Sequence, residues 1–200
     1  ALHFSFEKND KLPIVNISIA FRAGSASDPE SLPGLTNFMG EMLMRGTRLR
    51  TKTQLETKLD DLGSSLSIDT RTELLIFRGS VLAENLNPYL DLLREMILEP
   101  RFDEKEIEKM RSEFNASLLA ERSNDSALAN RAFERLLLSG HPYGHSPVGT
   151  VSSIKKMTKK SILDQYQKDI RGGDLIVVGT GAANPSVIES WANALIAKLP

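Results

Sequence analysis

Alternating apolar and polar residues predict strands at several places along the chain. From residue 15 to residue 21 every second side chain is large and apolar, which is the pattern of a strand with one buried face. Residues 65–70 and 72–82 predict two further strands, close enough along the chain to form a hairpin. A short apolar run over residues 174–180 predicts a buried strand, and the residues after Ala1 also have strand-like sequence.

Apolar residues at intervals of three and four predict helices between these strands. One helix is expected over residues 35–45. A second follows Thr51, which forms a capping-box pattern with Gln54. Asn87 and Pro88 are expected as the cap and the first residue of a third helix. The remaining helices are expected over residues 103–118, 128–140, 159–168 and 184–199.

The order of these elements indicates the fold class. One strand, two helices, two strands, four helices, a strand and a helix follow one another along the chain. This order is typical of an α+β fold in which helices pack on a mostly antiparallel sheet. Neither an internal repeat nor a linker divides the sequence, so residues 1–200 are expected to form a single domain excised from a longer chain.

Composition and charge exclude several classes of function. The 200 residues carry 25 Lys and Arg against 26 Asp and Glu, a net charge of −1, so neither nucleic acid nor an anionic membrane is an expected partner. No apolar run approaches the ~18–20 residues that cross a bilayer. Because the sequence has no cysteine, it has no disulfide, no cysteine metal site and no thiol nucleophile.

The histidines give a weak signal for metal chemistry. His141 and His145 are four residues apart, which is the spacing of two metal ligands on one helix face. Pro142 and Gly144 lie between them, so a turn whose histidines form hydrogen bonds is the simpler interpretation. The glycines near residue 180 lack the lysine of a phosphate-binding loop, and no serine lies in a Gly-x-Ser-x-Gly elbow.

One stretch of the sequence gives a more specific signal than the histidines and glycines do. The sequence Gly-Leu-Thr-Asn-Phe-Met-Gly-Glu-Met-Leu-Met-Arg-Gly-Thr over residues 34–47 resembles the active-site helix of the pitrilysin/insulinase family of zinc peptidases. Further matches follow in the family's order at residues 21–25, 62–63, 100–102, 140–144, 149–150 and 177–179. The resemblance covers nearly the whole chain and implies the α+β half-subunit of pitrilysin-like peptidases, with this chain as its first half.

The same resemblance identifies what the helix lacks. In that family an inverted His-x-x-Glu-His motif binds Zn²⁺ through two histidines, and its glutamate is the general base for the metal-bound water. Here Asn37 stands at the first histidine, Gly40 at the general base and Glu41 at the second histidine. An asparagine oxygen and one glutamate do not make a competitive zinc site, and glycine cannot take a proton.

The third zinc ligand of the family, a glutamate, is missing as well. Its place falls near Ala116 or Ser117, and neither residue can serve. Glu113 and Glu121 flank this place, each about one turn away. We therefore expect no catalytic residue, no metal ligand and no cofactor in this chain, which by itself is not an enzyme.

The resemblance implies a function in proteolysis through a partner. The leading hypothesis is a non-catalytic subunit or domain that builds a peptide-binding chamber with an active partner, which carries the zinc motif and the zinc. Family members bind unfolded peptide as an added strand on a sheet edge. The comparable edge here is Ser65, Leu66, Ser67 and Ile68. Paired bacterial subunits of the family imply a heterodimer in the periplasm.

Two alternatives remain open from the sequence. The chain could be a purely structural assembly subunit, since the core proteins of mitochondrial respiratory complexes resemble this family. It could also be a metallopeptidase with an unorthodox metal site formed by Glu41, His141 and His145. An excised half should uncover an apolar patch, through which a homodimer could form.

Overall fold

A five-stranded sheet organises the fold. The computed structural model describes residues 1–121 and 123–200. The strands are β1 (Leu2–Lys8), β2 (Ile14–Phe21), β3 (Ser65–Thr70), β4 (Leu75–Leu82) and β5 (Leu175–Gly181), in the order β1-β5-β2-β4-β3. Within these described residues β1 and β5 pair in parallel and the other strand pairs are antiparallel, so the predicted mostly antiparallel sheet is confirmed. The predicted order of elements omits β1, which adds a fifth strand beside β5.

The helices follow the predicted order with two differences. They are α1 (Leu35–Met42), α2 (Lys52–Asp61), α3 (Leu86–Leu98), α4 (Glu104–Glu121), α5 (Asp125–Leu137), α6 (Val151–Lys156), α7 (Lys159–Asp169) and α8 (Pro185–Ile196). Short 3-10 turns form η1 (Ser25–Ser27), η2 (Ala83–Asn85) and η3 (Pro142–Gly144). Helix α6 is not among the predicted helices, and α1 ends three residues earlier than predicted because the chain turns after Leu43.

Helix caps account for the correct and the incorrect boundaries. The Thr51 hydroxyl accepts from the Gln54 backbone N–H and the Gln54 side chain accepts from the Thr51 N–H, so the predicted capping box is present. Asn184 caps α8 as its sequence predicts. The predicted start of α3 is wrong, because Asn87 and Pro88 lie inside its first turn and the helix begins at Leu86.

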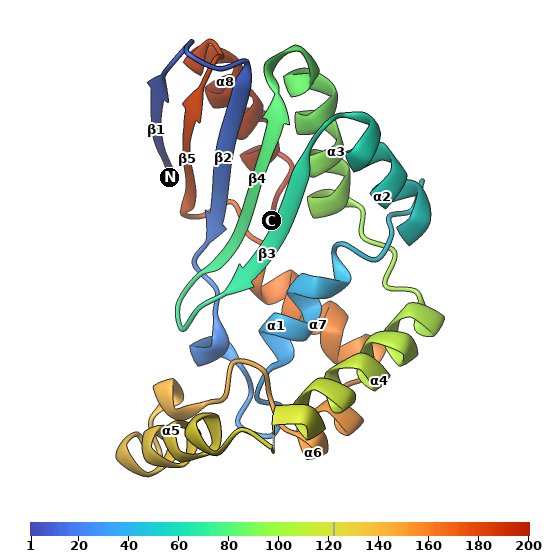
Figure 1. The fold of residues 1–200 in the computed structure, drawn as a ribbon, viewed down its shortest axis with the longest axis vertical. Helices are drawn as coiled ribbons and strands as arrows, with labels where there is room; N and C mark the ends of the chain where they lie inside the picture. Colours follow the sequence, from blue (N-terminus) through green and yellow to red (C-terminus); the bar gives the residue numbers. More distant parts are fainter. Residues whose placement is uncertain (122) are drawn as a thin grey trace.

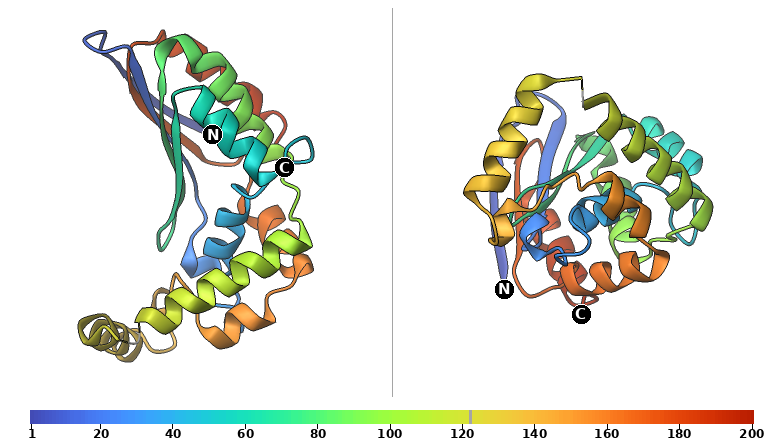
Figure 2. Two further views of the ribbon diagram at one scale, coloured as in Figure 1. Left: turned by 45° about the vertical axis from the view of Figure 1, so that its right-hand side comes forward. Right: turned by 90° about the horizontal axis from the view of Figure 1, so that it is seen from below.

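Helices cover one face of the sheet and leave the other open. Helices α3 and α8 lie behind the strands, and the indole N–H of Trp191 on α8 donates to the Leu90 carbonyl of α3 at 2.8 Å (Figures 1 and 2). The covered face carries the buried apolar residues of the strands, including Val15, Ile19 and Phe77. The open face is a shallow hollow of about 620 Å³. Small polar residues line much of it, namely Ser5, Asn16, Ser18, Ser65, Ser67, Ser80 and Thr180, together with Glu7, Ile17, Arg78 and Val178.

Tyr89 joins this helical layer to the outermost strand β3. Its side chain is fully buried, and its hydroxyl donates to the Ser65 carbonyl at 3.0 Å. It reaches that carbonyl by passing Gly79 of β4, where a Cβ atom would overlap the hydroxyl. Glycine at this strand position is therefore required by the close approach of a side chain.

A second cluster of helices lies below the sheet. Helices α1, α4, α6 and α7 pack together beyond the lower ends of β3 and β4 (Figure 1). The rings of Phe38 on α1 and Phe114 on α4 lie 5.2 Å apart, and the Arg111 guanidinium of α4 donates to the Met157 carbonyl at 2.8 Å. This packing fixes α1 between the sheet and α4.

Candidate functional site

The start of α1 is held by a buried carboxylate. Asp28 accepts hydrogen bonds from the Gly34 N–H at 2.6 Å, the Thr36 N–H at 2.8 Å and the Thr36 hydroxyl at 2.7 Å. Gly34 has a φ of +87°, and a Cβ there would lie 2.5 Å from the Gly149 nitrogen. The carboxylate satisfies N–H groups that a helix start leaves free, so it fixes the direction of α1.

A second buried carboxylate shares the Thr36 hydroxyl. The oxygen of that hydroxyl lies 3.1 Å from Asp169 of α7, which also accepts from the Gln165 side-chain amide at 2.7 Å. Since the hydroxyl has one hydrogen, it cannot donate to Asp28 and Asp169 at once. Burial raises the pKa of both carboxyls above the usual range, and the hydrogen bonds they accept oppose this only in part.

This pair predicts a pH-dependent effect of Asp169→Asn. A raised pKa means that the folded chain binds the proton of Asp169 more tightly than the unfolded chain does. The fold therefore loses stability as the pH rises above the usual pKa of an aspartate and Asp169 ionises. Asparagine cannot ionise and keeps an oxygen for Gln165. Relative to wild type, the Asp169→Asn variant should therefore have a higher free energy of unfolding at pH 7 than at pH 5. Urea titration at the two pH values measures this difference. The exposed Asp164 on the same helix gives the control Asp164→Asn. An equal difference at both pH values would contradict the prediction.

The general-base position on α1 is filled by the protein core. Gly40 is buried, and a Cβ atom added there would lie 2.8 Å from Leu75 Cδ1 and 3.3 Å from Ile68 Cγ2. Leu75 is fully buried on β4 and Ile68 is buried on β3. Side chains from two strands thus occupy the space into which a residue at this position would project.

Glu41, at the second histidine position, lies in a partly buried site. Burial raises the pKa of its carboxyl, and the charge of Arg45 opposes this. Arg45 follows Glu41 by four residues and lies just beyond the end of α1. Asn37, at the first histidine position, is partly buried one turn before Glu41. The three positions lie on the one helix α1, which contains no histidine.

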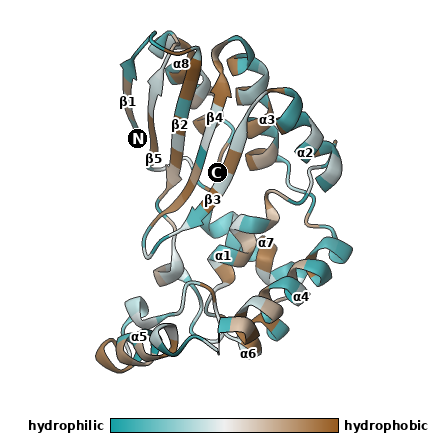
Figure 3. Cartoon of the chain, viewed as in Figure 1, coloured by the Kyte–Doolittle hydropathy of each residue, from teal (hydrophilic) through white to brown (hydrophobic). Residues whose placement is uncertain are grey.

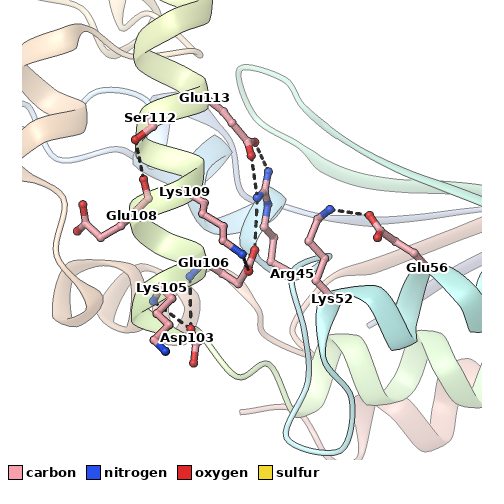
Figure 4. A network of polar contacts seen from close by, with 10 residues as sticks. All are labelled: Arg45, Lys52, Glu56, Asp103, Lys105, Glu106, Glu108, Lys109, Ser112 and Glu113. Atoms are coloured by element: carbon pink, nitrogen blue, oxygen red, sulfur yellow. Dashed lines mark hydrogen bonds and ion pairs between the residues drawn. The ribbon is translucent and has the colours of Figure 1, made fainter.

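Arg45 places a fixed cation beside this helix. Both of its terminal nitrogens bond the Glu113 carboxylate of α4, one at 3.2 Å, and one lies 3.5 Å from Glu106 (Figure 4). Lys109 binds the other Glu106 oxygen at 2.7 Å. The hydrogen bond from Arg45 holds the pKa of Glu113 below its usual range, and the hydrogen bond from Lys109 does so for Glu106.

In this ion-pair network Arg45 binds Glu113, the acidic residue next to the expected position of the third zinc ligand. Ala116 and Ser117 are exposed on α4 and offer no carboxylate. Glu113, one turn away, is bound by the Arg45 guanidinium, so a metal ion there would face a cation at close range. Two unit charges about 4 Å apart near a protein surface repel by about 4 kcal/mol. The network thus favours an ion pair over a metal.

The histidine loop forms a turn. His141 Nδ1 accepts from the Tyr143 N–H at 3.1 Å, and the two rings lie edge to face at 4.8 Å. Across residues 1–121 and 123–200, no three His, Asp or Glu side chains are grouped so that they could hold a metal ion. The alternative metal site of Glu41, His141 and His145 is therefore not assembled by this fold.

The predicted peptide-binding residues lie on an outermost strand. Ser65 to Ile68 belong to β3, which pairs with β4 on one side at the end of the sheet. Ser65 and Ser67 are exposed, whereas Leu66 and Ile68 turn toward the core. An extended peptide would meet backbone groups along this edge.

Sequence reasoning missed Arg45 and the acidic pair at the start of α1. Arg45 lies just beyond the end of α1, and no local pattern pairs it with Glu113. Asp28 and Asp169 are likewise joined only by the packing of α1 on α7. Within the described residues, no helix combines the length and apolar composition that a bilayer crossing requires.

The fold and the altered helix define a class: a zinc-peptidase-like α+β unit whose metal-binding helix has lost its ligands. A family model described as insulinase (peptidase family M16) matches residues 4–150, so the chain belongs to peptidase family M16. The predicted family is confirmed.

Three similar proteins extend this result. The non-peptidase homolog YmxG of Helicobacter pylori is 28% identical over 173 residues, which are 86% of this chain and 40% of the relative. A probable mitochondrial-processing peptidase subunit beta of Arabidopsis thaliana is 21% identical over 99% of this chain and 37% of its own length. A crystal structure of a peptidase M16 inactive domain from Pseudomonas fluorescens matches with a TM-score of 0.92 at 22% identity, over 98% of this chain and 48% of that one.

These matches confirm the predicted α+β half-subunit fold and a degenerate member of the family. The chain spans less than half the length of each of the three proteins.

Proposed function

We propose that this chain is a non-catalytic part of an M16 peptidase and forms one wall of a peptide-binding chamber. Its partner carries an intact His-x-x-Glu-His motif and the zinc ion. The observation that carries the proposal is α1, which keeps the family's helix while Gly40 is packed against Leu75 and Ile68. With no ligand set and no general base, this chain by itself is not a peptidase.

The relatives support this role through their names. One is called a non-peptidase homolog and another an inactive M16 domain. A third is called a subunit of a processing peptidase. A wall that does not cleave needs surfaces for peptide, and the exposed serines of β3 beside the open polar sheet face offer them. For paired subunits of this kind we propose the periplasm as the compartment.

The test combines this chain with a family subunit that keeps the zinc motif. Alone, after dialysis against zinc, the chain should hold almost no metal by elemental analysis and cleave no unfolded peptide. Added to the zinc subunit, it should raise peptide cleavage about tenfold or more. Unchanged cleavage by the mixture would overturn the proposal, and a stable complex without added cleavage would favour the assembly-subunit alternative.

Peptide contact is tested separately by photo-crosslinking. A photoreactive residue at Ser67 of β3 should crosslink to an unfolded peptide substrate in the mixture. The matched control is Ser186, an exposed serine on α8, outside the open face of the sheet. Equal crosslinking at both residues would show that β3 is not a specific peptide-binding edge.

A further inference from the structure

Helix α5 turns its apolar side away from the protein. Its polar residues Asn130, Arg131, Glu134 and Arg135 line a cavity of about 830 Å³ between α5 and the rest of the chain. Its large apolar residues are exposed, and brown apolar segments alternate with teal polar ones in the α5 ribbon (Figure 3). A helix on the surface of a monomer has the reverse orientation.

The α5 side chains that the structure describes are hardly buried. None falls in the buried class, and an ion pair from Arg131 to Glu121 ties the helix to α4. A helix of 13 residues is marginal in water without tertiary packing. The exposed fractions are 39% for Leu128, 64% for Phe133, 79% for Leu136 and 67% for Leu137.

These residues form one apolar patch. Their exposed fractions amount to roughly two and a half fully exposed large side chains, on the order of 450 Å². Contiguous apolar patches of this size on soluble proteins are commonly interaction sites. We define the α5 apolar face as Leu128, Ala129, Ala132, Phe133, Leu136 and Leu137, all of them exposed.

The α5 apolar face is complementary to itself. Its six positions are symmetric about the midpoint between Ala132 and Phe133. In an antiparallel pair of α5 helices, Phe133 therefore faces the partner copy's small residue at position 132, and Leu136 faces the small residue at position 129. Two of the three pairs thus set a large side chain against a small one, as close helix packing favours, and the third sets Leu128 against the partner copy's leucine at position 137. A parallel pair would instead place two phenylalanines against each other.

We propose that the α5 apolar face binds a second copy of this chain through a two-fold, antiparallel contact. Two copies would bury on the order of 900 Å² of apolar surface, which lies in the range of small, reversible interfaces. The occupant is a second copy because one pattern supplies both sides of the contact. This inference is independent of the proposed function.

Sedimentation equilibrium of the 200-residue chain tests the dimer. Between about 1 and 100 μM, the mass should rise from 22.1 kDa toward twice that value. Leu136→Glu and Phe133→Asp should each weaken association about tenfold or more. The matched control is Leu49→Glu, because Leu49 is 69% exposed outside α5 and should leave association unchanged.

The lack of native cysteine allows a direct test of the register. In the antiparallel pair the two residues at position 132 lie next to the two-fold axis, whereas the two at position 137 lie about 13 Å apart along the helices. Ala132→Cys should form a disulfide-linked dimer on oxidation and Leu137→Cys should not, because a disulfide needs Cα atoms within ~7 Å. A mixture of Leu128→Cys and Leu137→Cys chains should form the mixed dimer.

Three outcomes would overturn the proposal. They are a monomer up to 100 μM, a dimer that Leu49→Glu disrupts as strongly as Leu136→Glu does, and crosslinking at residue 137 in place of residue 132. Ala132→Cys keeps every large apolar side chain of the α5 apolar face, so it tests the contact even if a charged variant unfolds. Circular dichroism confirms the fold of each variant.

Discussion

Restoring the three motif residues will not restore zinc binding. The triple variant Asn37→His, Gly40→Glu and Glu41→His is expected to hold less than about one-tenth of a zinc ion per chain after dialysis. The glutamate at residue 40 must displace Leu75 and Ile68, and Arg45 still holds Glu113 away from a third-ligand role.

The same variant should be strongly destabilised. Overpacking of a core costs about 1–3 kcal/mol, and a buried carboxylate without a partner costs more, so the free energy of unfolding should fall by about 3 kcal/mol or more. Urea titration measures this loss. The double variant Asn37→His and Glu41→His keeps Gly40 and should retain most of the stability. One zinc per chain in the triple variant would show that α1 is still a competent metal helix.

Replacing Gly79 by alanine is expected to cost about 3–5 kcal/mol of stability. The added methyl group overlaps the Tyr89 hydroxyl and lies 2.5 Å from the Ser65 carbonyl oxygen. Neither neighbour can move freely, since Tyr89 is fully buried and Ser65 is paired with Ser80. The expected loss of stability is larger than that of ordinary overpacking, because the variant loses both the local packing and the Tyr89 hydrogen bond.

A double-mutant cycle checks this assignment. Tyr89→Phe alone should cost about 1–2 kcal/mol, because it removes the hydrogen bond to Ser65. The combined variant Gly79→Ala and Tyr89→Phe should cost less than the sum of the two, since phenylalanine lacks the clashing hydroxyl. Gly173→Ala is the control, because a Cβ there meets nothing within 4 Å. Additive losses would show that the clash lies elsewhere.

Local patterns predicted most elements of the fold. The alternation around Ile17 and the capping box at Thr51 are written in adjacent residues, and both are confirmed. Strand β1 was left out of the predicted order because its partner is at the far end of the chain, where residue 2 pairs with residue 175. The start of α3 was misplaced because Asn85, not Asn87, occupies the cap position.

Some features of the candidate site can be predicted from the sequence, and others depend on contacts between distant segments. Asn37, Gly40 and Glu41 are assigned by the resemblance of residues 34–47 to the family's helix, which is contained in one short stretch of sequence. The packing of Gly40 on Leu75 and the binding of Glu113 by Arg45 depend on contacts between distant segments. Periodicity likewise predicted that α5 is amphipathic, but it carries no information on which side of the helix the rest of the chain covers.

The position of β5 has a consequence for synthesis of the chain on the ribosome. Strands β1 and β2 are neighbours in sequence, yet β5 lies between them in the sheet and pairs with both (Figure 1). Until residues 175–181 emerge, β1 has no partner strand and one edge of β2 stays open. Unpaired strand edges promote association between nascent chains, so factors that bind extended segments should engage this chain until β5 is made.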